Sequence, residues 1–377
     1  MKPKKVIVVG STGSIGQSAI HIIRQNPELL QAAGLSAHSN KELLLRQAHD
    51  CGIANIALTS EQKKSDNFAY IGERGAESLI RNTKADIVLN GISGSAGLGS
   101  SIAALESGKD LALANKETVV MAGPLILSLA SSAKKKIIPV DSEHSAIFHL
   151  LSKTKREAVQ EIVLTASGGA FRDLPLENLE QVTYKDALSH PTWNMGNKIT
   201  VDSATMANKG LEIIEAHELF HFPLDKIKVV IHPQSYVHSL IKTVEGSMYA
   251  QISKPDMRIP IQNALTFPEV HESPYGLLDL SDCTFTFQKP EKERFPCLDI
   301  ARTAAAGGGS YPLCFNASNE AAVAAFAEGR IKFTQIARVI LSCLDGDWGN
   351  LLISFDQVFE MDQLARRVAG EIIDTLA

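Results

Sequence analysis

The hydrophobic residues in the first third of the chain form short runs that alternate with helical stretches. Residues 5–10, 85–92 and 110–115 each contain a short apolar run (VIVV, IVL and LALA), which is typical of strands buried on both faces. Residues 14–27 predict a helix that ends at Pro27. This alternation predicts a parallel sheet with helices covering both faces.

The middle of the chain has longer β-rich runs. Residues 161–171 and 228–252 predict strands, and the second run predicts an antiparallel pair that turns at 245–247. Between the two runs, a helix is predicted from Ser203, as its N-cap, to about Phe220. This pattern is typical of an α+β domain with helices on one face of its sheet.

The last part of the chain is helical and follows a Pro-rich, irregular segment. Ser318 is expected to begin a helix that ends at Gly329, and Ser354 and Gln357 stand at capping-box spacing. The predicted fold class is therefore α/β, with a second domain and a small helical bundle. The expected divisions are a Rossmann-like domain over 1–141, an α+β domain over 142–266, a linker over 267–294 and the bundle over 295–377.

Composition narrows the class of protein. The 377 residues are 45% hydrophobic and 21% charged, as in ordinary soluble globular proteins. The formal net charge of −5 argues against a nucleic-acid partner, and no apolar segment is long enough to span a bilayer. The five cysteines are odd in number and have no CxxC spacing, so we expect reduced thiols and a cytoplasmic location.

A glycine-rich turn follows the first strand. Gly10, Gly13 and Gly16 stand in GxxGxxG spacing between that strand and the start of a helix. Such a turn lets backbone N–H groups approach a pyrophosphate, and the helix dipole favours the negative charge. The pattern predicts a dinucleotide site. The alternative is a glycine turn that closes a βα unit with no ligand.

The end of the second strand favours NADP over NAD. NAD sites carry an acidic residue about 20 residues past the glycine turn, where it binds the ribose 2′-hydroxyl. Here residues 37–41 read AHSNK, with no carboxylate to repel a 2′-phosphate and several donors to hold one. The alternative is an ordinary polar loop.

Two carboxylates follow a later strand. Asp141 and Glu143 stand two positions apart, so in an extended backbone their side chains project to the same side. They repel each other unless a cation or a proton lies between them, and oxygen ligands suit magnesium or manganese. His144 is a further candidate ligand, but it is expected to pack or to face solvent. The alternative is an exposed acidic turn.

One short segment near the middle gathers a hydroxyl, an amide, an ammonium and two carboxylates. Asn208 and Glu212 stand four positions apart on one predicted helix face. Ser203, Asn208 and Lys209 near a helix N-terminus suit a phosphate, and Glu212 would complete a three-carboxylate set. The alternative is an amphipathic helix with a solvated Lys–Glu pair. Asp202 has no assigned role.

The loop before this segment carries large apolar side chains. Trp193 and Met195 favour a lid that closes over a ligand, and the alternative is a Trp that anchors the loop on the core. His190 in the same loop and the turn at Ser167 are candidate donors to an anion. Residues 115–117 end a buried strand, on the usual ligand side of a parallel sheet.

Taken together, six segments resemble the 1-deoxy-D-xylulose 5-phosphate reductoisomerase family. In the family's order they read GSTGSIG, LANKE, PVDSEHSA, SGGAFR, HPTWNMGNKITVDSATMANKGLEIIEA and IHPQSYVHS. The resemblance runs from residue 4 to the C-terminal bundle. It implies a V-shaped homodimeric enzyme of the non-mevalonate isoprenoid pathway. It also implies NADPH and a divalent cation (Mg²⁺, Mn²⁺ or Co²⁺), with a sugar phosphate rearranged and reduced to 2-C-methyl-D-erythritol 4-phosphate.

The resemblance also implies roles for individual residues. The implied metal ligands are Asp141, Glu143 and Glu212. The implied substrate and catalytic residues are Lys116, Ser142, Glu143, Ser167, His190, Ser203, Asn208, Lys209 and Glu212. The implied cofactor residues are Thr12, Gly13, Ser14, Ile15, His38, Ser39, Asn40, Asn115, Glu117 and Gly196, and the implied flap residues are Trp193 and Met195. Many members carry glycine and a basic residue where this chain has His38 and Ser39, which leaves Lys41 as a candidate cation for the 2′-phosphate.

Two other functions fit part of the sequence. A different NADP-dependent dehydrogenase, of semialdehyde or homoserine type, would share the two-domain plan. A phosphorylating semialdehyde enzyme needs an activated cysteine, and none of the five cysteines lies in the motifs above. A non-enzymatic NADP-binding sensor would explain the glycine turn but neither the carboxylates nor the phosphate donors.

Overall fold

The computed structural model describes residues 2–63 and 67–376, which form two compact units. Unit 1 comprises residues up to 118 together with 126–145 and 256–277, and unit 2 comprises 119–125, 146–255 and 278 onwards. Neither unit is a single stretch of sequence, because the chain passes between them several times. The divisions expected at 141, 266 and 294 stay a prediction about domains.

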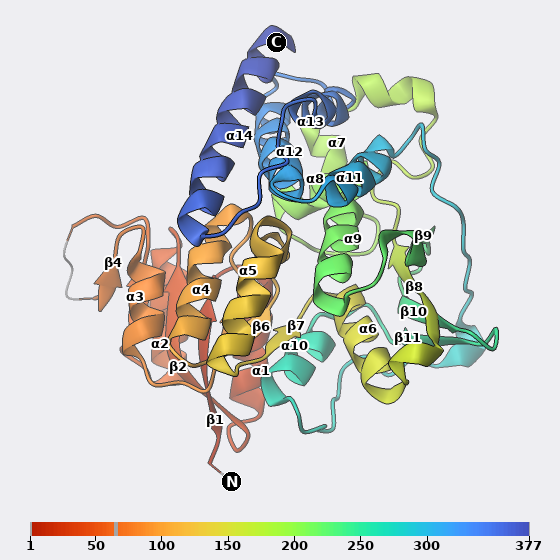
Figure 1. Ribbon diagram of the computed structural model, residues 1–377. Helices are drawn as coiled ribbons and strands as arrows, with labels where there is room; N and C mark the ends of the chain where they lie inside the picture. Colours follow the sequence, from red (N-terminus) through yellow and green to blue (C-terminus); the bar gives the residue numbers. More distant parts are fainter. Residues whose placement is uncertain (1, 64–66, 377) are drawn as a thin grey trace. The chain divides into compact units, whose positions relative to one another are not determined.

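Unit 1 is built on a seven-stranded parallel sheet (Figure 1). Its strands are β1 (Lys4–Val9), β2 (Leu30–Ala37), β3 (Ile56–Leu58), β4 (Tyr70–Ile71), β5 (Ile87–Asn90), β6 (Asp110–Leu113) and β7 (Ile137–Pro139). They lie in the order β4-β3-β2-β1-β5-β6-β7, with every neighbouring pair parallel. The order reverses between β1 and β5, and Rossmann-like folds bind ligands at the carboxyl ends of such strands. The α/β class is confirmed.

Helices cover this sheet on both faces. They are α1 (Ser14–Gln25), α2 (Lys41–Cys51), α3 (Gly75–Asn82), α4 (Leu98–Glu106), α5 (Glu117–Ala133) and α10 (Arg258–Thr266), with a 3-10 turn, η1 (Ser95–Gly97). α3 packs beside α4 on one face (Figure 1), and α1 packs against α10. Residues 6–9 of β1 are fully buried, as expected for a strand covered on both sides. α5 bends at Ala122, two residues before Pro124.

Unit 2 contains a second, mixed sheet. Its strands are β8 (Val159–Ala166), β9 (Ile227–Ile231), β10 (Val237–Thr243) and β11 (Met248–Ile252), in the order β11-β10-β8-β9. β10 is antiparallel to β8 and to β11, and residues 244–247 form the predicted turn between β10 and β11. β8 and β9 are parallel, because the segment joining them contains helices instead of a tight hairpin.

The remaining helices belong to unit 2, apart from the first four residues of α6. They are α6 (Ser142–Lys153), α7 (Tyr184–Ala187), α8 (Asn197–Thr205), α9 (Ala207–Phe220), α11 (Pro296–Gly307), α12 (Tyr311–Ala327), α13 (Gln335–Leu344) and α14 (Phe355–Leu376). Short 3-10 turns are η2 (Arg156–Ala158), η3 (Leu176–Gln181), η4 (Leu224–Lys226) and η5 (Leu280–Asp282). Ile147 of α6, Ile213 of α9 and Leu298 of α11 share a buried core with Ile162 of β8 and Ile227 of β9. Helices therefore pack on the sheet as the α+β pattern predicts.

The helix expected from Ser203 to Phe220 is wrong as a single element. Met206 adopts a left-handed backbone with φ 56°, which ends α8 and starts α9. Ser203 therefore lies inside α8 and does not cap a helix. Likewise, α12 begins at Tyr311 and not at Ser318, because the Ser318 hydroxyl donates to the carbonyl of the preceding turn, a bond that fits a helix interior.

The C-terminal helices form the predicted bundle, in which α12, α13 and α14 pack on one another. The start of α14 has the Ser354 half of the predicted capping box, while the Gln357 side chain reaches the residue before the N-cap. The backbone N–H of Gln357 donates to the Ser354 hydroxyl at 3.3 Å, and Ile353 N–H donates to the Gln357 side chain at 2.9 Å. Among residues 2–63 and 67–376, every helix lacks the combination of length and apolar character needed to cross a membrane.

Candidate active site

The glycine turn between β1 and α1 leaves no room for a side chain at Gly10 or at Gly16. Gly10 has φ +74°, and a Cβ there would lie 2.8 Å from the carbonyl carbon of Gly91. A Cβ on Gly16 would lie 2.3 Å from the Gly10 carbonyl oxygen. Within the described part of the chain, no side chain caps the N-terminus of the twelve-residue helix α1, so its N–H groups can face an anion. The residues that present this N-terminus are Thr12, Gly13, Ser14 and Ile15.

His38, Ser39 and Asn40 lie exposed just past β2, next to the end of β1. The His38 ring nitrogen Nδ1 lies 3.0 Å from the Thr59 hydroxyl. The Asn40 side chain accepts from Leu43 N–H at 3.2 Å and so caps α2. Any contact from Asn40 to a nucleotide would therefore come from groups other than that oxygen.

Asn115 and Glu117 follow β6, next to the end of β5. Asn115 is 1% exposed. Its amide donates to the carbonyls of Ile92 at 2.9 Å and Gly94 at 2.8 Å, and to the Glu117 carboxylate at 3.0 Å. Its oxygen accepts from Thr118. Asn115 therefore braces the loop after β5, at the edge of the sheet where a nucleotide is expected.

Lys116 and Asp141 meet at the ends of β6 and β7. The ammonium lies 2.7 Å from Asp141 Oδ2, and the two side chains are 4% and 12% exposed. The other carboxylate oxygen accepts from Glu143 N–H at 3.2 Å and lies 3.2 Å from His144 Nδ1. Asp141 thus caps α6, while a lysine balances its charge.

The extended backbone expected for Asp141 and Glu143 is wrong. β7 ends at Pro139 and α6 begins at Ser142, so Glu143 lies in the first helical turn, where the helix dipole favours a carboxylate. The Ser142 hydroxyl donates to Glu143 Oε2 at 2.5 Å. His144 is fully buried, as a packing histidine would be. In the sequence, the only sign of the contact between His144 and Asp141 is that His144 stands three positions after the residue that caps the helix.

In unit 2, Ser167 lies in the turn after β8 and is hydrogen-bonded to His190. The Ser167 hydroxyl oxygen lies 2.9 Å from His190 Nε2. His190 Nδ1 accepts from the N–H groups of Thr192 at 3.1 Å and Trp193 at 2.8 Å. Nδ1 is therefore the unprotonated nitrogen, and Nε2–H donates to Ser167. The Gly169 N–H also donates to this oxygen at 3.3 Å, which leaves the Ser167 O–H to donate to an anion.

The electrostatics of this pair support the same hydrogen positions. Burial, and to a lesser degree the positive charge of Arg172, lowers the pKa of His190 to about 4. The imidazole is then neutral at neutral pH. Arg172 also donates to the Ser167 carbonyl at 2.8 Å, so a cationic group holds the turn that carries the hydroxyl.

The same turn presses on α8. Gly169 has φ +67°, and a Cβ there would lie 2.4 Å from the Ser203 carbonyl oxygen and 2.6 Å from the Cα of Ala204. Only glycine allows this approach. The structure therefore brings the predicted anion donors Ser167 and His190 next to the helix that carries Ser203.

The predicted face of α9 is present, with Asn208 half-buried and Lys209 and Glu212 buried. The Asn208 amide donates to Glu212 Oε1 at 2.6 Å, and the Lys209 ammonium pairs with Glu212 Oε2. Lys209 and Glu212 side chains are 4% and 1% exposed. The alternative of a solvated Lys–Glu pair is wrong. A buried pair of this kind needs strong local compensation, which Asn208 helps to supply.

The loop before α8 is irregular and partly exposed, with Trp193 and Met195 half-buried. The Trp193 ring lies 6.4 Å from the His238 ring, and Thr192 donates to the Pro233 carbonyl at 3.4 Å. The Gly196 carbonyl accepts from Thr200 and so begins α8. The loop is thus tethered at its two ends, at His190 and at Gly196.

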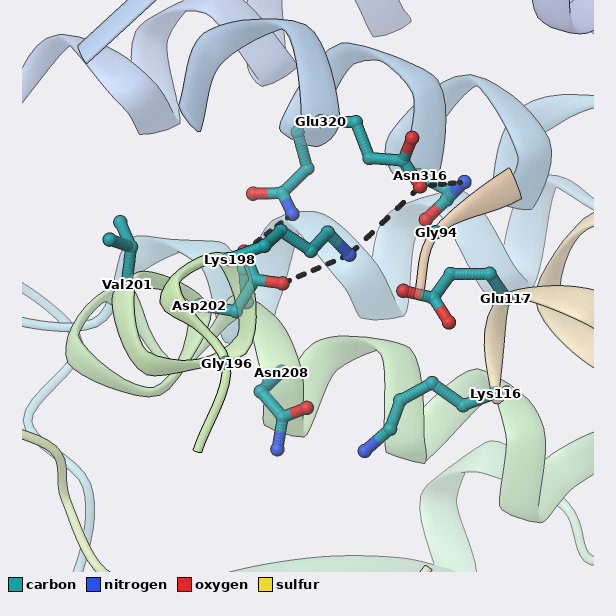
Figure 2. Close-up of polar contacts among 12 residues, drawn as sticks. Gly94, Lys116, Glu117, Gly196, Lys198, Val201, Asp202, Asn208, Asn316 and Glu320 are labelled. Carbon is teal, nitrogen blue, oxygen red and sulfur yellow. Dashed lines mark hydrogen bonds and ion pairs between the residues drawn. The ribbon is translucent and has the colours of Figure 1, made fainter. Parts of the chain in front are cut away.

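Asp202, which the sequence left without a role, lies at the centre of a polar network in unit 2 (Figure 2). It is 1% exposed and accepts from Asn319 at 2.8 Å, while its other oxygen lies 3.0 Å from the Lys198 ammonium. Asn319 is 117 positions away in the sequence. Helix spacing within α8 could have suggested the Lys198 pair, but not the bond to α12.

Comparison with known proteins gives a consistent result. Three family models match this chain: 1-deoxy-D-xylulose 5-phosphate reductoisomerase over residues 6–123, its C-terminal domain over 137–220, and the DXP reductoisomerase C-terminal domain over 252–368. The 1-deoxy-D-xylulose 5-phosphate reductoisomerase of Treponema denticola is 46% identical over 380 residues, covering 99% of this chain and 98% of that protein. That of Gloeobacter violaceus is 44% identical, covering 96% of each chain.

Solved structures agree with these matches. The Zymomonas mobilis 1-deoxy-D-xylulose 5-phosphate reductoisomerase in complex with NADPH has a TM-score of 0.91 and 38% identity, covering 99% of this chain and 100% of that one. A DOX-P reductoisomerase in complex with NADPH, fosmidomycin and magnesium has a TM-score of 0.92 and 36% identity, covering 99% of each chain.

Proposed function

This chain belongs to the 1-deoxy-D-xylulose 5-phosphate reductoisomerase family, and we propose how its own residues divide the work of that reaction. The chain rearranges and reduces 1-deoxy-D-xylulose 5-phosphate to 2-C-methyl-D-erythritol 4-phosphate, using NADPH and a divalent cation. The Asn208–Lys209–Glu212 cluster, with its buried Lys209 and Glu212, carries the proposal, because it presents an amide, an ammonium and a carboxylate together to a sugar phosphate and a cation. A dehydrogenase of semialdehyde or homoserine type is not favoured.

Asp141, Glu143 and Glu212 are the proposed metal ligands. Their oxygen donors suit Mg²⁺, Mn²⁺ or Co²⁺. Asp141 lies beside the ammonium of Lys116, and Glu212 lies beside that of Lys209. Such cations are expected where a fold concentrates negative charge. When bound, the cation would supply Lewis acidity to the carbonyl and hydroxyl oxygens of the substrate.

The phosphate end of the substrate is assigned to unit 2. The donors proposed for it are Ser167, His190, Ser203, Asn208 and Lys209. Ser167 supports this assignment, because its oxygen accepts hydrogen bonds from His190 and Gly169 through its lone pairs. Its O–H group is then the part that can donate to a phosphate. These contacts would supply binding energy remote from the reacting carbons. Trp193 and Met195 would close over the bound sugar and exclude water.

The nucleotide is assigned to unit 1. Thr12, Gly13, Ser14 and Ile15 would receive the pyrophosphate at the open N-terminus of α1. His38, Ser39, Asn40 and Lys41 would face the 2′-phosphate, and Asn115 and Glu117 would line the rest of the site in unit 1. NADPH would supply a hydride, and Lys116 and Ser142 would steady the reacting oxygens.

Turnover with defined components tests this assignment. Oxidation of NADPH should require both 1-deoxy-D-xylulose 5-phosphate and Mg²⁺ or Mn²⁺, and EDTA should abolish it. NADH should be a poorer reductant, because residues 37–41 carry no acid for a free 2′-hydroxyl. Full activity after metal removal would rule the proposal out.

A homodimer is also proposed, through the edge of the second sheet. β11 is an edge strand, and its side chains Met248, Tyr249 and Ile252 are 54%, 48% and 44% exposed. Exposed apolar side chains on an edge strand favour pairing with a second chain. Tyr249→Asp should shift sedimentation toward the monomer, whereas an unchanged dimer would place the interface elsewhere.

The cytoplasm remains the proposed compartment. All five cysteines are free thiols, and Cys297, Cys314 and Cys343 are buried. Reduced cysteines are typical of cytosolic proteins. Fractionation of cells that produce the chain would test this location.

A further inference from the structure

Lys198 stands where the loop over residues 189–196 becomes helix α8. Its ammonium lies 3.0 Å from Asp202 Oδ2, one turn further along α8, and 4.0 Å from Glu320 Oε1 on α12. Figure 2 shows the side chain reaching toward both carboxylates. Lys198 is 21% exposed, Asp202 1% and Glu320 14%. The first turn of α8 is therefore fastened to α12 by charge.

A second layer of ion pairs fixes the α12 end of this contact. Glu320 pairs with Arg366 of α14 at 2.7 Å, and Arg366 also pairs with Asp362 at 2.7 Å. The Asn316 amide donates to Glu320 at 3.2 Å. Glu320 is thus held from two sides, so the carboxylate that faces Lys198 has little freedom to turn.

Asp202 fixes the rotation of α8 about its own axis. One oxygen binds Lys198, and the other accepts from Asn319 at 2.8 Å. Ser203 is the next residue, about 100° around the helix, and its backbone meets the Gly169 turn. With Asp202 held against α12, the neighbouring side of α8, at Ser203, faces the turn that carries Ser167.

Stability alone does not account for such a network. Buried ion pairs are often no more stabilising than apolar side chains of similar volume, because removing charges from water is costly. The better-attested use of buried charges is to fix one arrangement among several. What this network fixes is the register of α8, and with it the end of the loop that carries Trp193 and Met195.

We propose that Lys198 is a positioning residue for the flap: its pairs with Asp202 and Glu320 anchor the α8 end of residues 189–196, so that the flap closes in register over the sugar phosphate. The inference rests on the flap role proposed above for Trp193 and Met195. The anchor touches no atom of the substrate itself. It acts through the backbone at Gly196 and through Ser203.

Lys198→Met removes the ammonium and keeps the length of the side chain, and Lys198→Arg keeps the charge. We expect Lys198→Met to raise KM for the sugar phosphate about 10-fold or more, with a smaller fall in kcat, because a loop misplaced by an ångström loses orientation. Lys198→Arg should recover most of the loss. Lys332→Met is the matched control, since the Lys332 ammonium pairs with Glu180 at the surface, where the two side chains are 59% and 65% exposed.

The flap can be followed directly, because the chain has two tryptophans. Trp348 is buried far from the flap in sequence and donates to the Cys343 carbonyl, so Trp348→Phe leaves Trp193 as the single indole reporter. Binding of 1-deoxy-D-xylulose 5-phosphate with Mg²⁺ should change Trp193 emission. Lys198→Met should reduce that change at saturating substrate, and the Lys332 control should leave it intact.

An unchanged KM together with an unchanged Trp193 response in Lys198→Met would overturn the anchor, as would a loss confined to kcat. If Lys198→Met does not fold, Glu320→Gln tests the same link with the side-chain volume kept, and it should raise KM in the same direction. The proposed function is judged separately, by turnover of the unaltered chain, so the two ideas fail on different measurements.

Discussion

Each unit contains a carboxylate whose charge is balanced by a lysine, but the two pairs are built differently. In unit 1, Lys116 and Asp141 come from the ends of two neighbouring strands. In unit 2, Lys209 and Glu212 lie one turn apart on α9. The first pair depends on the parallel sheet, and the second on the period of a single helix.

The pairs also differ in how much solvent reaches them. Asp141 is 12% exposed and also caps α6, whereas Glu212 is 1% exposed and is held by Asn208 and Lys209. A carboxylate that retains water needs its lysine less than one that retains none. The α9 carboxylate should therefore be the more sensitive of the two to every change in its partners.

The largest effect is expected from Glu212→Gln. The substitution keeps the volume and much of the hydrogen bonding but removes the negative charge proposed to hold the cation. Metal-dependent turnover should fall about 1,000-fold, the rate equivalent of several kcal/mol of lost charge stabilisation. NADPH binding, measured by its fluorescence, should stay within about two-fold. Glu218→Gln on the same helix is the control, and near-normal turnover in Glu212→Gln would remove it from the metal set.

Removing the lysines compares the two pairs directly. Lys209→Met should lower the free energy of unfolding by about 3 to 5 kcal/mol, because it breaks a buried pair. Lys116→Met should cost about 1 to 3 kcal/mol, since Asp141 keeps the Glu143 N–H and the His144 ring. Urea unfolding measures both values. Equal losses would show that burial does not separate the two regions.

The sequence predicts contacts between residues close in the chain better than contacts between residues far apart in the chain. Asn208 and Glu212 share a face because helix periodicity places i and i+4 together, and the structure confirms it. Met206 breaks the expected helix, because a left-handed methionine is stabilised by its surroundings and not by its own preference. The hydrogen bond between Asp202 and Asn319 also cannot be predicted from the sequence pattern, since only tertiary packing brings α8 against α12.

The same reasoning applies to unit 1. The GxxGxxG turn was found because close backbone approach demands glycine at Gly10 and Gly16. The apolar run before Glu143 predicts an extended backbone, but helix α6 begins at Ser142, just after that run. The Glu143 carboxylate belongs to a helix N-terminus, where the dipole favours it.

A smaller effect is expected from the neutral side chains that donate to Glu212 in unit 2 and to Glu143 in unit 1. Asn208→Ala removes a donor from the buried Glu212 and should lower the free energy of unfolding by about 1 to 3 kcal/mol. Ser142→Ala removes the donor to Glu143, which solvent can replace, and should cost about 0.5 kcal/mol or less. Thermal unfolding of both variants gives the ranking. A larger loss for Ser142→Ala would contradict the contrast between the regions.

A change in the slope of stability with pH, confined to acid conditions, is expected from unit 2. Burial, then the charge of Arg172, lowers the pKa of His190 from 6.5 to about 4. The unfolded chain then binds more protons than the folded chain between those pH values, so the free energy of unfolding falls as pH falls through that window. His190→Gln should flatten this acid limb without removing it, because burial also lowers the pKa of His149 and His232. Unfolding free energies measured across the window and at neutral pH check the slope, and superimposable curves would mean that folding does not lower the pKa of His190.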